Sequence, residues 1–356
     1  PPYEKLMINT MNMVNYLARH DLNGARIEAR RLAVMQKYVR DSQSPGLAMI
    51  APGSYLAGFV FERSGRADEA LRYYDEALEF GQFPSLVAPI RRLQKLSSFD
   101  SERIRKLLAA YPEAAVSTAP GDSASSSSAA PSSAASSNAA SSSAVPAGAP
   151  DASAPGELLV ILNYGRVPAK VARRIPIGLA LTYASLYMSS SQSATAGHLA
   201  GQGLVTWVNF PDLEEQTRSL STPSVRVNGS YLQLEGALAV DVEARKAYDR
   251  DKGAIIASAI TRLITRVAVG EGARAAAGDQ NLLGILLSLG TQAALTAADT
   301  PDTRSWATLP ARITVGRVLL PPGTHDVALE AQGQRKTVRV QMKPGGWEAV
   351  TMTVLR

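Results

Sequence analysis

Apolar side chains recur at the three- and four-residue spacing of helices through residues 3–113. The first positions that carry this spacing are Met7, Met11, Val14 and Ala18, and those after a break at residues 21–24 are Ile27, Val34 and Tyr38. The pattern predicts two helices joined by a short turn, each with one apolar face.

The next pair of helices carries small and aromatic residues at the spacing of a tetratricopeptide repeat. These residues are Gly58, Phe61, Gly65, Ala70, Tyr74 and Ala77. Small residues let two antiparallel helices approach closely, and the two aromatic rings fill the space between them. We therefore expect Gly58, Phe61, Ala70, Tyr74 and Ala77 to form the repeat packing, with residues 64–66 as the turn.

The first hairpin fits the repeat less well, because it keeps Tyr16 and Ala25 but has Met13 where a glycine is usual. We interpret it as a degenerate repeat. Helices near 84–96 and 101–111 are expected to cap the array, since a stack of hairpins needs a terminal element over its last apolar face. Asp100 and Ser101 are candidate N-cap residues for the second of these helices.

Between the helices and the remainder of the chain, the composition changes to Ser, Ala, Pro and Gly. Residues 114–155 contain too few apolar side chains to offset an ordering cost of roughly 1 to 2 kcal/mol per residue. We predict a disordered linker here, with a Ser-rich glycosylated stalk as the alternative.

The third segment, residues 156–356, reads as a mixed α/β domain. Residues 158–162 are an unbroken apolar run, as in a strand that is covered on both faces. Asn228-Gly229 stands between alternating apolar residues, which is a strong hairpin signal. A long helix follows with Ile256, Ile260 and Leu263 on one face.

Alternation of apolar and polar residues near the end of the chain predicts further strands around residues 313–315, 327–329, 338–342 and 350–354. We expect these strands to form a small antiparallel sheet or sandwich with a turn at Pro321, Pro322 and Gly323. The predicted fold class is α+β with several domains: helical hairpins over 1–113, a linker over 114–155, and a mixed domain over 156–356.

Composition agrees with a globular protein in more than one unit. The chain has 356 residues, of which 46% are hydrophobic and 19% charged. The formal net charge is +6, but Lys and Arg are scattered, so no nucleic-acid partner is expected. Cysteine is absent, which excludes disulfides and thiolate metal sites within this sequence. The chain begins at Pro1, which we interpret as the result of processing or trimming that removed any targeting segment.

No set of residues points to an enzyme. His20, His198 and His325 are far apart and form no metal-ligand pair, and no serine stands in a Gly-x-Ser-x-Gly turn. The closely spaced acids, Asp241 with Glu243 and Asp249 with Asp251, are more typical of a helix start than of paired acid and base groups. Gly270, Gly272 and Gly278 lack the context of a phosphate-binding loop and are expected to form a hinge between helices. We predict no catalytic, cofactor-binding or metal-binding residues and no cofactor.

Two apolar runs are candidates for contacts outside the core. Residues 282–298 are shorter than a typical membrane span and contain Thr and Gln, which favours a buried helix or an oligomer contact over membrane insertion. Residues 179–188 place Tyr183 and Tyr187 on one helical face. Core packing is the default there, with membrane-surface contact as the alternative, since residues 189–203 are polar and are expected to be mobile.

Arg304 and Trp306 complete the set of candidate interface residues with Tyr183 and Tyr187. Trp and Arg often anchor interfaces when they are partly exposed. The alternative, which we prefer, is that Trp306 fills a gap in the sheet while Arg304 caps a helix or neutralises Asp302.

Several segments resemble a family of bacterial envelope proteins that are mostly uncharacterised and often predicted to be lipoproteins. The resemblance is carried by residues 302–310, Arg317, residues 322–325 and residues 163–170, and in the helical part by Tyr16, Asp21, Ala25, Arg30 and Arg31. It implies an exported protein in the periplasm or at the outer membrane, held by a lipid anchor or by partners. A lipid-modified cysteine would start the mature chain of such a protein, and this sequence has none.

These observations predict a non-enzymatic scaffold or adaptor of the cell envelope. The helical hairpins would present a concave surface to a peptide or protein, and the mixed domain would dock to a second envelope component. The alternative is a structural subunit that assembles with copies of itself through the runs at 179–188 and 282–298, as a ring or surface appendage. An enzyme of unrecognised type ranks third.

Overall fold

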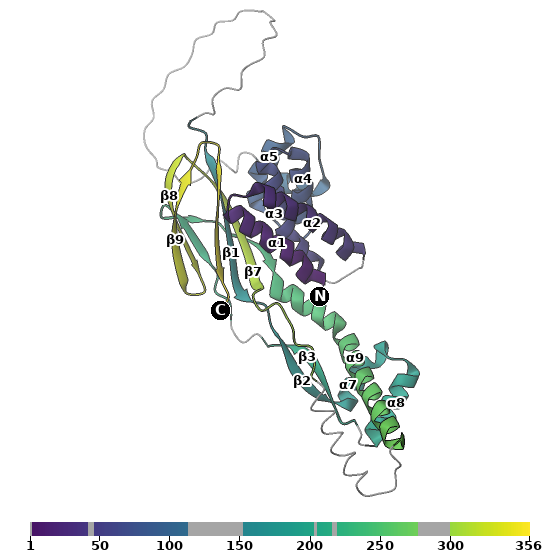
Figure 1. The fold of residues 1–356 in the computed structure, drawn as a ribbon. Helices are drawn as coiled ribbons and strands as arrows, with labels where there is room; N and C mark the ends of the chain where they lie inside the picture. Colours follow the sequence, from purple (N-terminus) through teal and green to yellow (C-terminus); the bar gives the residue numbers. More distant parts are fainter. Residues whose placement is uncertain (1, 42–45, 113–151, 203–204, 216–218, 277–299) are drawn as a thin grey trace, which may run out of the picture.

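The computed structural model describes residues 2–41, 46–112, 152–202, 205–215, 219–276 and 300–356. Most of the predicted linker and the apolar segment 282–298 lie outside these residues. The described chain begins with helices and continues into a β-rich region with antiparallel strand pairs, which confirms the α+β class (Figure 1).

The helical part packs as successive pairs, α1 on α2 and α3 on α4. Its helices are α1 (Pro2–Ala18), α2 (Leu22–Asp41), α3 (Ile50–Arg63), α4 (Ala67–Leu78), α5 (Val87–Gln94) and α6 (Glu102–Ala110), with short 3-10 turns η1 (Leu47–Met49) and η2 (Pro84–Leu86). Gly65 has a φ of +71° in the predicted turn after α3, a conformation that glycine adopts without strain. Ser101 is the N-cap of α6, as predicted, since its hydroxyl accepts a hydrogen bond from the Ile104 amide at 3.2 Å.

Two four-stranded sheets form a sandwich next to these helices. The central sheet has the order β10-β1-β7-β6, and the outer sheet has the order β5-β4-β8-β9. The strands are β1 (Gly156–Arg166), β4 (Ser224–Val227), β5 (Ser230–Leu232), β6 (Glu235–Ala239), β7 (Pro310–Leu320), β8 (Gly323–Ala331), β9 (Gln334–Met342) and β10 (Trp347–Val354).

Strand β1 is buried on both faces, which confirms the interpretation of its apolar run. Leu159 and Ile161 belong to the same apolar core as the helices, whereas Leu158, Val160 and Leu162 face the outer sheet. The central sheet therefore lies between the helices on one side and the outer sheet on the other.

The Asn228-Gly229 hairpin is confirmed as β4–β5. Both residues have positive φ angles, 50° and 86°, as a type I′ turn requires. The expectation of a wholly antiparallel C-terminal sheet is wrong in one respect, because β10 pairs with β1 in parallel. The predicted turn at Pro321 and Pro322 does exist, but it joins β7 in the central sheet to β8 in the outer sheet.

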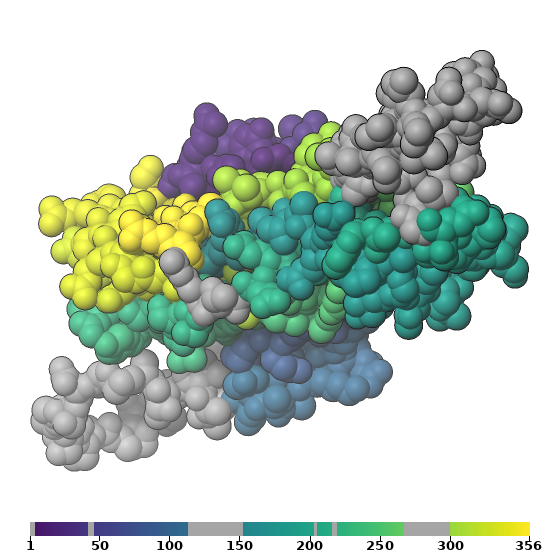
Figure 2. All heavy atoms as spheres, turned by 90° about the horizontal axis from the view of Figure 1, so that it is seen from below, coloured from purple at the N-terminus to yellow at the C-terminus, as the bar shows by residue number. Residues whose placement is uncertain are grey.

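A lobe extends from the sandwich along the long helix α9 (Val240–Ala276). We call this the distal lobe; it contains the ribbon β2 (Lys170–Pro176) and β3 (Trp207–Leu213), the helix α7 (Ile177–Ala184), the turn η4 (Ser185–Tyr187) and α8 (Ser190–Gly201), packed on α9. In Figure 2 its teal surface lies at the end of the molecule opposite the yellow C-terminal strands.

Two predictions fail in this lobe. Residues 190–201 form α8 rather than a mobile segment, because Ser189 and Gln192 make a capping box that satisfies the first amides of the helix. Gly270 and Gly272 lie within α9 rather than at a hinge, and Gly278 is outside the described residues.

Candidate interaction surfaces

The predicted repeat-packing residues lie at the contact between α3 and α4. A Cβ atom added to Gly58 would approach the Tyr74 ring to 2.3 Å, so the ring occupies the space that the glycine leaves. Ala70 and Ala77 are fully buried, and Phe61 stacks on Tyr73 with ring centroids 5.3 Å apart. Small residues and rings therefore join these two helices as the sequence predicted.

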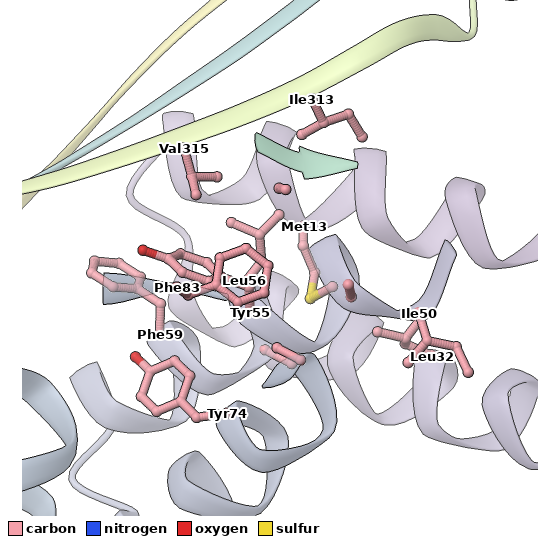
Figure 3. Packing of buried hydrophobic residues seen from close by; sticks show 14 of the residues in the cluster. Met13, Leu32, Ile50, Tyr55, Leu56, Phe59, Tyr74, Phe83, Ile313 and Val315 are labelled. Atoms are coloured by element: carbon pink, nitrogen blue, oxygen red, sulfur yellow. The ribbon is translucent and has the colours of Figure 1, made fainter. Parts of the chain in front are cut away.

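The helices do not present a free inner face, however, because the central sheet covers it. Figure 3 shows Ile313 and Val315 of β7 on the side of the strand that faces the rings of Tyr55, Phe59 and Phe83. The structure thus corrects the expectation of an open concave surface on the helical hairpins. The apolar residues that would line it are buried against the chain's own β-strands.

Aromatic contacts extend this interface to the edge strand β10. The Phe59 ring packs edge-on to Trp347 with centroids 5.7 Å apart. The His20 ring lies at a tilt of 31° to the same indole with centroids 4.8 Å apart, and its Nε2 lies 2.7 Å from the Glu348 carboxylate. His20 therefore contacts the sheet from the end of α1 while its side chain remains 47% exposed.

A buried cluster of charges lies at the centre of this interface. The Arg317 side chain of β7 is only 2% exposed and donates to Glu62 Oε2 of α3 at 2.9 Å, to Glu157 Oε1 of β1 at 2.7 Å and to the Tyr74 hydroxyl at 2.9 Å. Arg63 and Arg92 complete the cluster by donating to both carboxylates. Every carboxylate in the cluster thus has guanidinium partners from both the helices and the sheet.

The pKa of Glu62 follows from these partners. Burial alone would raise the pKa of its carboxyl, but the positive charges of Arg317 and Arg63, together with the Tyr74 hydroxyl, hold that pKa well below its usual range. Glu62 is therefore ionised, and the cluster contains three guanidinium groups against two carboxylates. Such a set stabilises one particular docking of helices on sheet, because any shift would leave buried charges unpaired.

A second polar contact joins the helices to β6. The Glu235 carboxylate accepts from both the amide and the hydroxyl of Ser85, each at 2.6 Å, and the same hydroxyl lies 2.8 Å from the Tyr55 hydroxyl. Burial raises the pKa of Glu235 above its ordinary value. This contact joins the η2 turn and the middle of α3 to β6, whereas the charged cluster joins the C-terminal end of α3 to β1 and β7.

Asp241, Arg304 and His325 have separate partners and are not brought together. Asp241 pairs with Arg312, Arg304 pairs with Asp302, and His325 bonds Asn228 at 2.8 Å and the Pro321 carbonyl at 2.8 Å. Within the described residues no group of His, Asp and Glu side chains is arranged to hold a metal ion. These three residues therefore do not form a common site.

Arg304 and Trp306 are not brought to Tyr183 and Tyr187 by any contact in the described structure. Arg304 is highly exposed and forms three hydrogen bonds with Asp302, from the guanidinium at 2.9 and 2.8 Å and from the backbone amide at 3.1 Å, which hold the pKa of that carboxyl below its usual range. Trp306 is partly buried at the edge of the helix and sheet core and donates to Thr308 at 2.7 Å. The pairing of Arg304 with Asp302 agrees with the alternative we preferred from the sequence.

Tyr183 and Tyr187, in contrast, are exposed together on the distal lobe. They are 47% and 51% exposed, next to Leu179 at 45% and Leu186 at 91%, so core packing of this run is wrong for its outer face. We call these four residues the distal surface. The sequence from 177 to 211 that contains it has no Asp, Glu, Lys or Arg.

The two tyrosines of the distal surface pack against α9. A Cβ at Gly253 would approach the Tyr187 ring to 2.3 Å, so this glycine lets the ring lie against the α9 backbone. The Tyr187 hydroxyl donates to the Arg250 carbonyl at 3.4 Å, and the Lys252 ammonium lies 5.6 Å from the centre of the Tyr183 ring. The exposed rings therefore have fixed orientations before any partner binds.

Sequence reasoning missed a second exposed apolar surface, on α2. Ile27, Val34 and Tyr38 give that helix its apolar spacing, but they are 51%, 70% and 52% exposed. The buried side of α2 is instead formed by Ala25, Ala29, Leu32 and Val39, with the polar residues Glu28 and Gln36. Because most of the buried positions of α2 carry small or polar residues, the apolar spacing in the sequence did not identify the buried face.

Comparison of the chain with protein-family models, with curated proteins and with solved structures finds no match. Within the described residues, no helix is both long enough and apolar enough to cross a membrane. The exposed surfaces and the buried interface are therefore the basis on which a function is inferred.

Proposed function

We propose that this chain is a non-enzymatic scaffold or adaptor of the bacterial cell envelope that binds a partner protein through the distal surface. The observation that carries this proposal is the exposure of Leu179, Tyr183, Leu186 and Tyr187 together on a charge-free, rigidly held segment. The envelope location is supported by the resemblance of residues 302–310 and 163–170 to envelope proteins.

The composition of the distal surface fits a protein interface. Interface centres are enriched in Tyr and depleted of charged residues, and they bind best when their anchors are ordered in advance. Leu186 is 91% exposed, so its side chain contributes almost no apolar burial to the folded protein. Contact with a partner would bury that apolar surface and stabilise the complex. The packing of Tyr187 on α9 supplies the required order.

We also propose that the helical part is a tetratricopeptide-like module, supported by the fit of Tyr74 against Gly58. Its role in the scaffold differs from the usual one, because its inner face packs on the central sheet. The module thereby makes helices and sandwich one platform from which the distal lobe extends (Figure 1).

Site-specific photo-cross-linking tests this function. A photoreactive amino acid at position 186 should give a cross-link to a defined protein in cells that express the chain naturally. The same amino acid at Leu96, which is 78% exposed but belongs to the helical part, is the matched control. Absence of a cross-link at 186, or the same set of cross-links from both positions, would contradict the proposal.

Self-assembly into a structural subunit is the second candidate, and the absence of acidic and basic side chains among the four residues of the distal surface favours it, with Lys252 of α9 beside Tyr183. Two copies of one patch can face each other without like-charge repulsion when the patch carries no charge. Sedimentation over a range of protein concentrations decides between the candidates. Oligomers that Leu186→Asp converts to monomers would support the subunit, whereas a monomer at all concentrations would favour the adaptor.

A further inference from the structure

The outward face of α2 is an apolar stripe between cations. At about 100° per residue, Ile27, Val34 and Tyr38 lie within roughly 40° of one another around the helix axis. Arg30 and Lys37 fall on one side of this stripe and Arg31 on the other. All six residues are exposed, so the stripe spans about three helical turns without cover from the described chain.

Helix α1 extends this face. The Lys5 ammonium lies 5.6 Å from the centre of the Tyr38 ring, which places the start of α1 beside the end of α2. Ile8 follows Lys5 by nearly one turn on the same side of α1 and is 48% exposed. Because the two helices run antiparallel, Ile8 is level with the part of α2 that carries Val34. We call Ile8, Ile27, Val34 and Tyr38 the end face of the helical stack.

The charge around the end face is net positive, because Lys5, Arg30, Arg31 and Lys37 lie beside it, against the exposed Asp41 at the end of α2 and the buried Glu28. Among the described residues, Lys5, Arg30 and Lys37 take part in no ion pair, and the Lys5 ammonium lies over the Tyr38 ring. Arg31 does pair with Glu28, but that carboxylate is buried and also accepts from Asn9 at 2.8 Å. A ligand that covers the end face therefore meets cations along its edges.

Stacks of helical hairpins need polar outer faces at their ends to remain soluble. At the other end of this stack, α5 and α6 supply a cover, with Ile104 and Leu107 turned into the core. The end face has no such cover among the described residues. The apolar stripe on α2 has the length and width of the apolar face of a short amphipathic helix, so such a helix could pack on it.

We propose that the end face is the docking site for an amphipathic helix of a partner protein, about three turns long and with acidic residues beside its apolar stripe. The inference goes beyond the function proposed above, because a different surface carries it and the distal surface takes no part. The acidic flanks follow from Lys5, Arg30 and Lys37, and the apolar stripe from Ile8, Val34 and Tyr38.

Peptide binding by fluorescence anisotropy tests this proposal on the full chain. The probes are three labelled 18-residue model peptides: a Leu/Glu amphipathic helix, a scrambled peptide of the same composition, and a Leu/Lys amphipathic helix. We expect the Leu/Glu helix to bind at least about tenfold more tightly than the other two. Its affinity should fall as salt is raised, because exposed charges contribute.

Val34→Glu should weaken binding of the Leu/Glu helix by at least about tenfold, since it places a carboxylate in the stripe. Leu96→Glu, the same change at an exposed leucine of the helical part, should leave binding unchanged, and circular dichroism should show that both variants are folded. The double variant Arg30→Glu/Lys37→Glu should bind the Leu/Lys helix in preference to the Leu/Glu helix.

Equal binding of the Leu/Glu and scrambled peptides, or tighter binding of the Leu/Lys helix to the unmodified chain, would overturn the proposal. So would an unchanged affinity in the Val34→Glu variant. If sedimentation shows that Val34→Glu dissociates an oligomer of the unmodified chain, a second copy occupies the end face and the proposed partner is wrong. None of these outcomes depends on cross-linking at position 186.

Discussion

Gly58 shows how one missing side chain determines a helix contact. A Cβ at this position would lie 2.3 Å from two atoms of the Tyr74 ring. The hydroxyl of that tyrosine donates a hydrogen bond to Glu62 at 2.5 Å, so the ring cannot move away without breaking this bond. Gly58→Ala should therefore lower the free energy of unfolding by about 1 to 3 kcal/mol, despite the better helix propensity of alanine. Urea titration measures this change.

Gly197 provides the matched control for that substitution. It lies inside α8, and a Cβ there would meet nothing within 4 Å. Gly197→Ala should raise the free energy of unfolding by about 0.5 to 1 kcal/mol through its effect on the unfolded chain and on helix propensity. A loss of stability equal to that of Gly58→Ala would show that close packing against Tyr74 is not the cause.

Arg317 is the residue on which the helix and sheet interface most depends. Arg317→Met would leave the buried carboxylates of Glu62 and Glu157 with only the guanidinium groups of Arg63 and Arg92 at the edge of the cluster. We expect a loss of about 3 to 5 kcal/mol, as when one partner of a buried ion pair is removed. Arg304→Met, at an exposed ion pair with Asp302, should cost at most about 1 kcal/mol in the same assay.

The depressed pKa of Glu62 predicts a pH dependence with a definite sign. A carboxyl whose pKa is lower in the folded state contributes stability above its unfolded pKa, about 4.3, and that contribution is lost as the pH falls toward the folded value. The destabilisation caused by Glu62→Gln should therefore be largest near pH 7 and shrink below about pH 4. Glu235 has the same raised pKa in the unmodified protein and in the Glu62→Gln variant, so its effect cancels when their free energies of unfolding are subtracted.

Unfolding free energies of the two proteins between pH 7 and pH 3 measure this effect. A penalty for Glu62→Gln that stays constant across the range would mean that Glu62 has an ordinary pKa. It would also mean that the charged cluster contributes only packing to the interface.

At the scale of elements, local signals predicted local structure well. The Asn228-Gly229 turn, the run that became β1 and the N-cap at Ser101 each depend on a few neighbouring residues, and each is confirmed. The parallel pairing of β10 with β1 joins Asn163 to Thr353, 190 residues apart, and no local pattern specifies it. The same holds for Arg317, whose burial arises only when α3, β1 and β7 meet.

The two exposed surfaces were misjudged for a related reason. Periodicity identifies an apolar face but not whether a neighbour covers it, so Val34 and Tyr38 on α2 and Tyr183 on α7 read as core positions. Tyr183 and Tyr187 were still predicted as interface candidates, because aromatic residues on one helical face suit either role. Arg304 and Trp306 form hydrogen bonds with residues two positions away in the sequence, and such local contacts can be predicted from the sequence.

We predict that the order of α8 depends on its capping box. Ser189→Ala removes the side-chain acceptor for the Gln192 amide and should destabilise α8 by about 0.5 to 2 kcal/mol. Amide hydrogen exchange should quicken in residues 190–201 and remain unchanged in α3. Uniformly faster exchange in both helices would show that α8 is not an independent element.

At the scale of the whole molecule, the helices and the sandwich share one core, so the covalent connection between them is not required for their contact. A protease site introduced between residues 113 and 151 should allow cleavage into two fragments that elute together in size-exclusion chromatography. Arg317→Met in the cleaved protein should separate them more readily, because it weakens the interface. Separation of the unmodified fragments would contradict a shared core.

The place of β7 and β10 in the central sheet also affects how the chain is made. The helices leave the ribosome first and β1 follows soon after, but β7 and β10, which also cover the inner face, begin about 200 residues or more after the end of α6. At translation rates of about 5 to 20 residues per second, Tyr55, Phe59 and Phe83 are not covered by β7 and β10 for on the order of ten seconds or more. During that interval the apolar face of the nascent helices is available to chaperones, and we expect the yield in a cell to fall when chaperones are depleted.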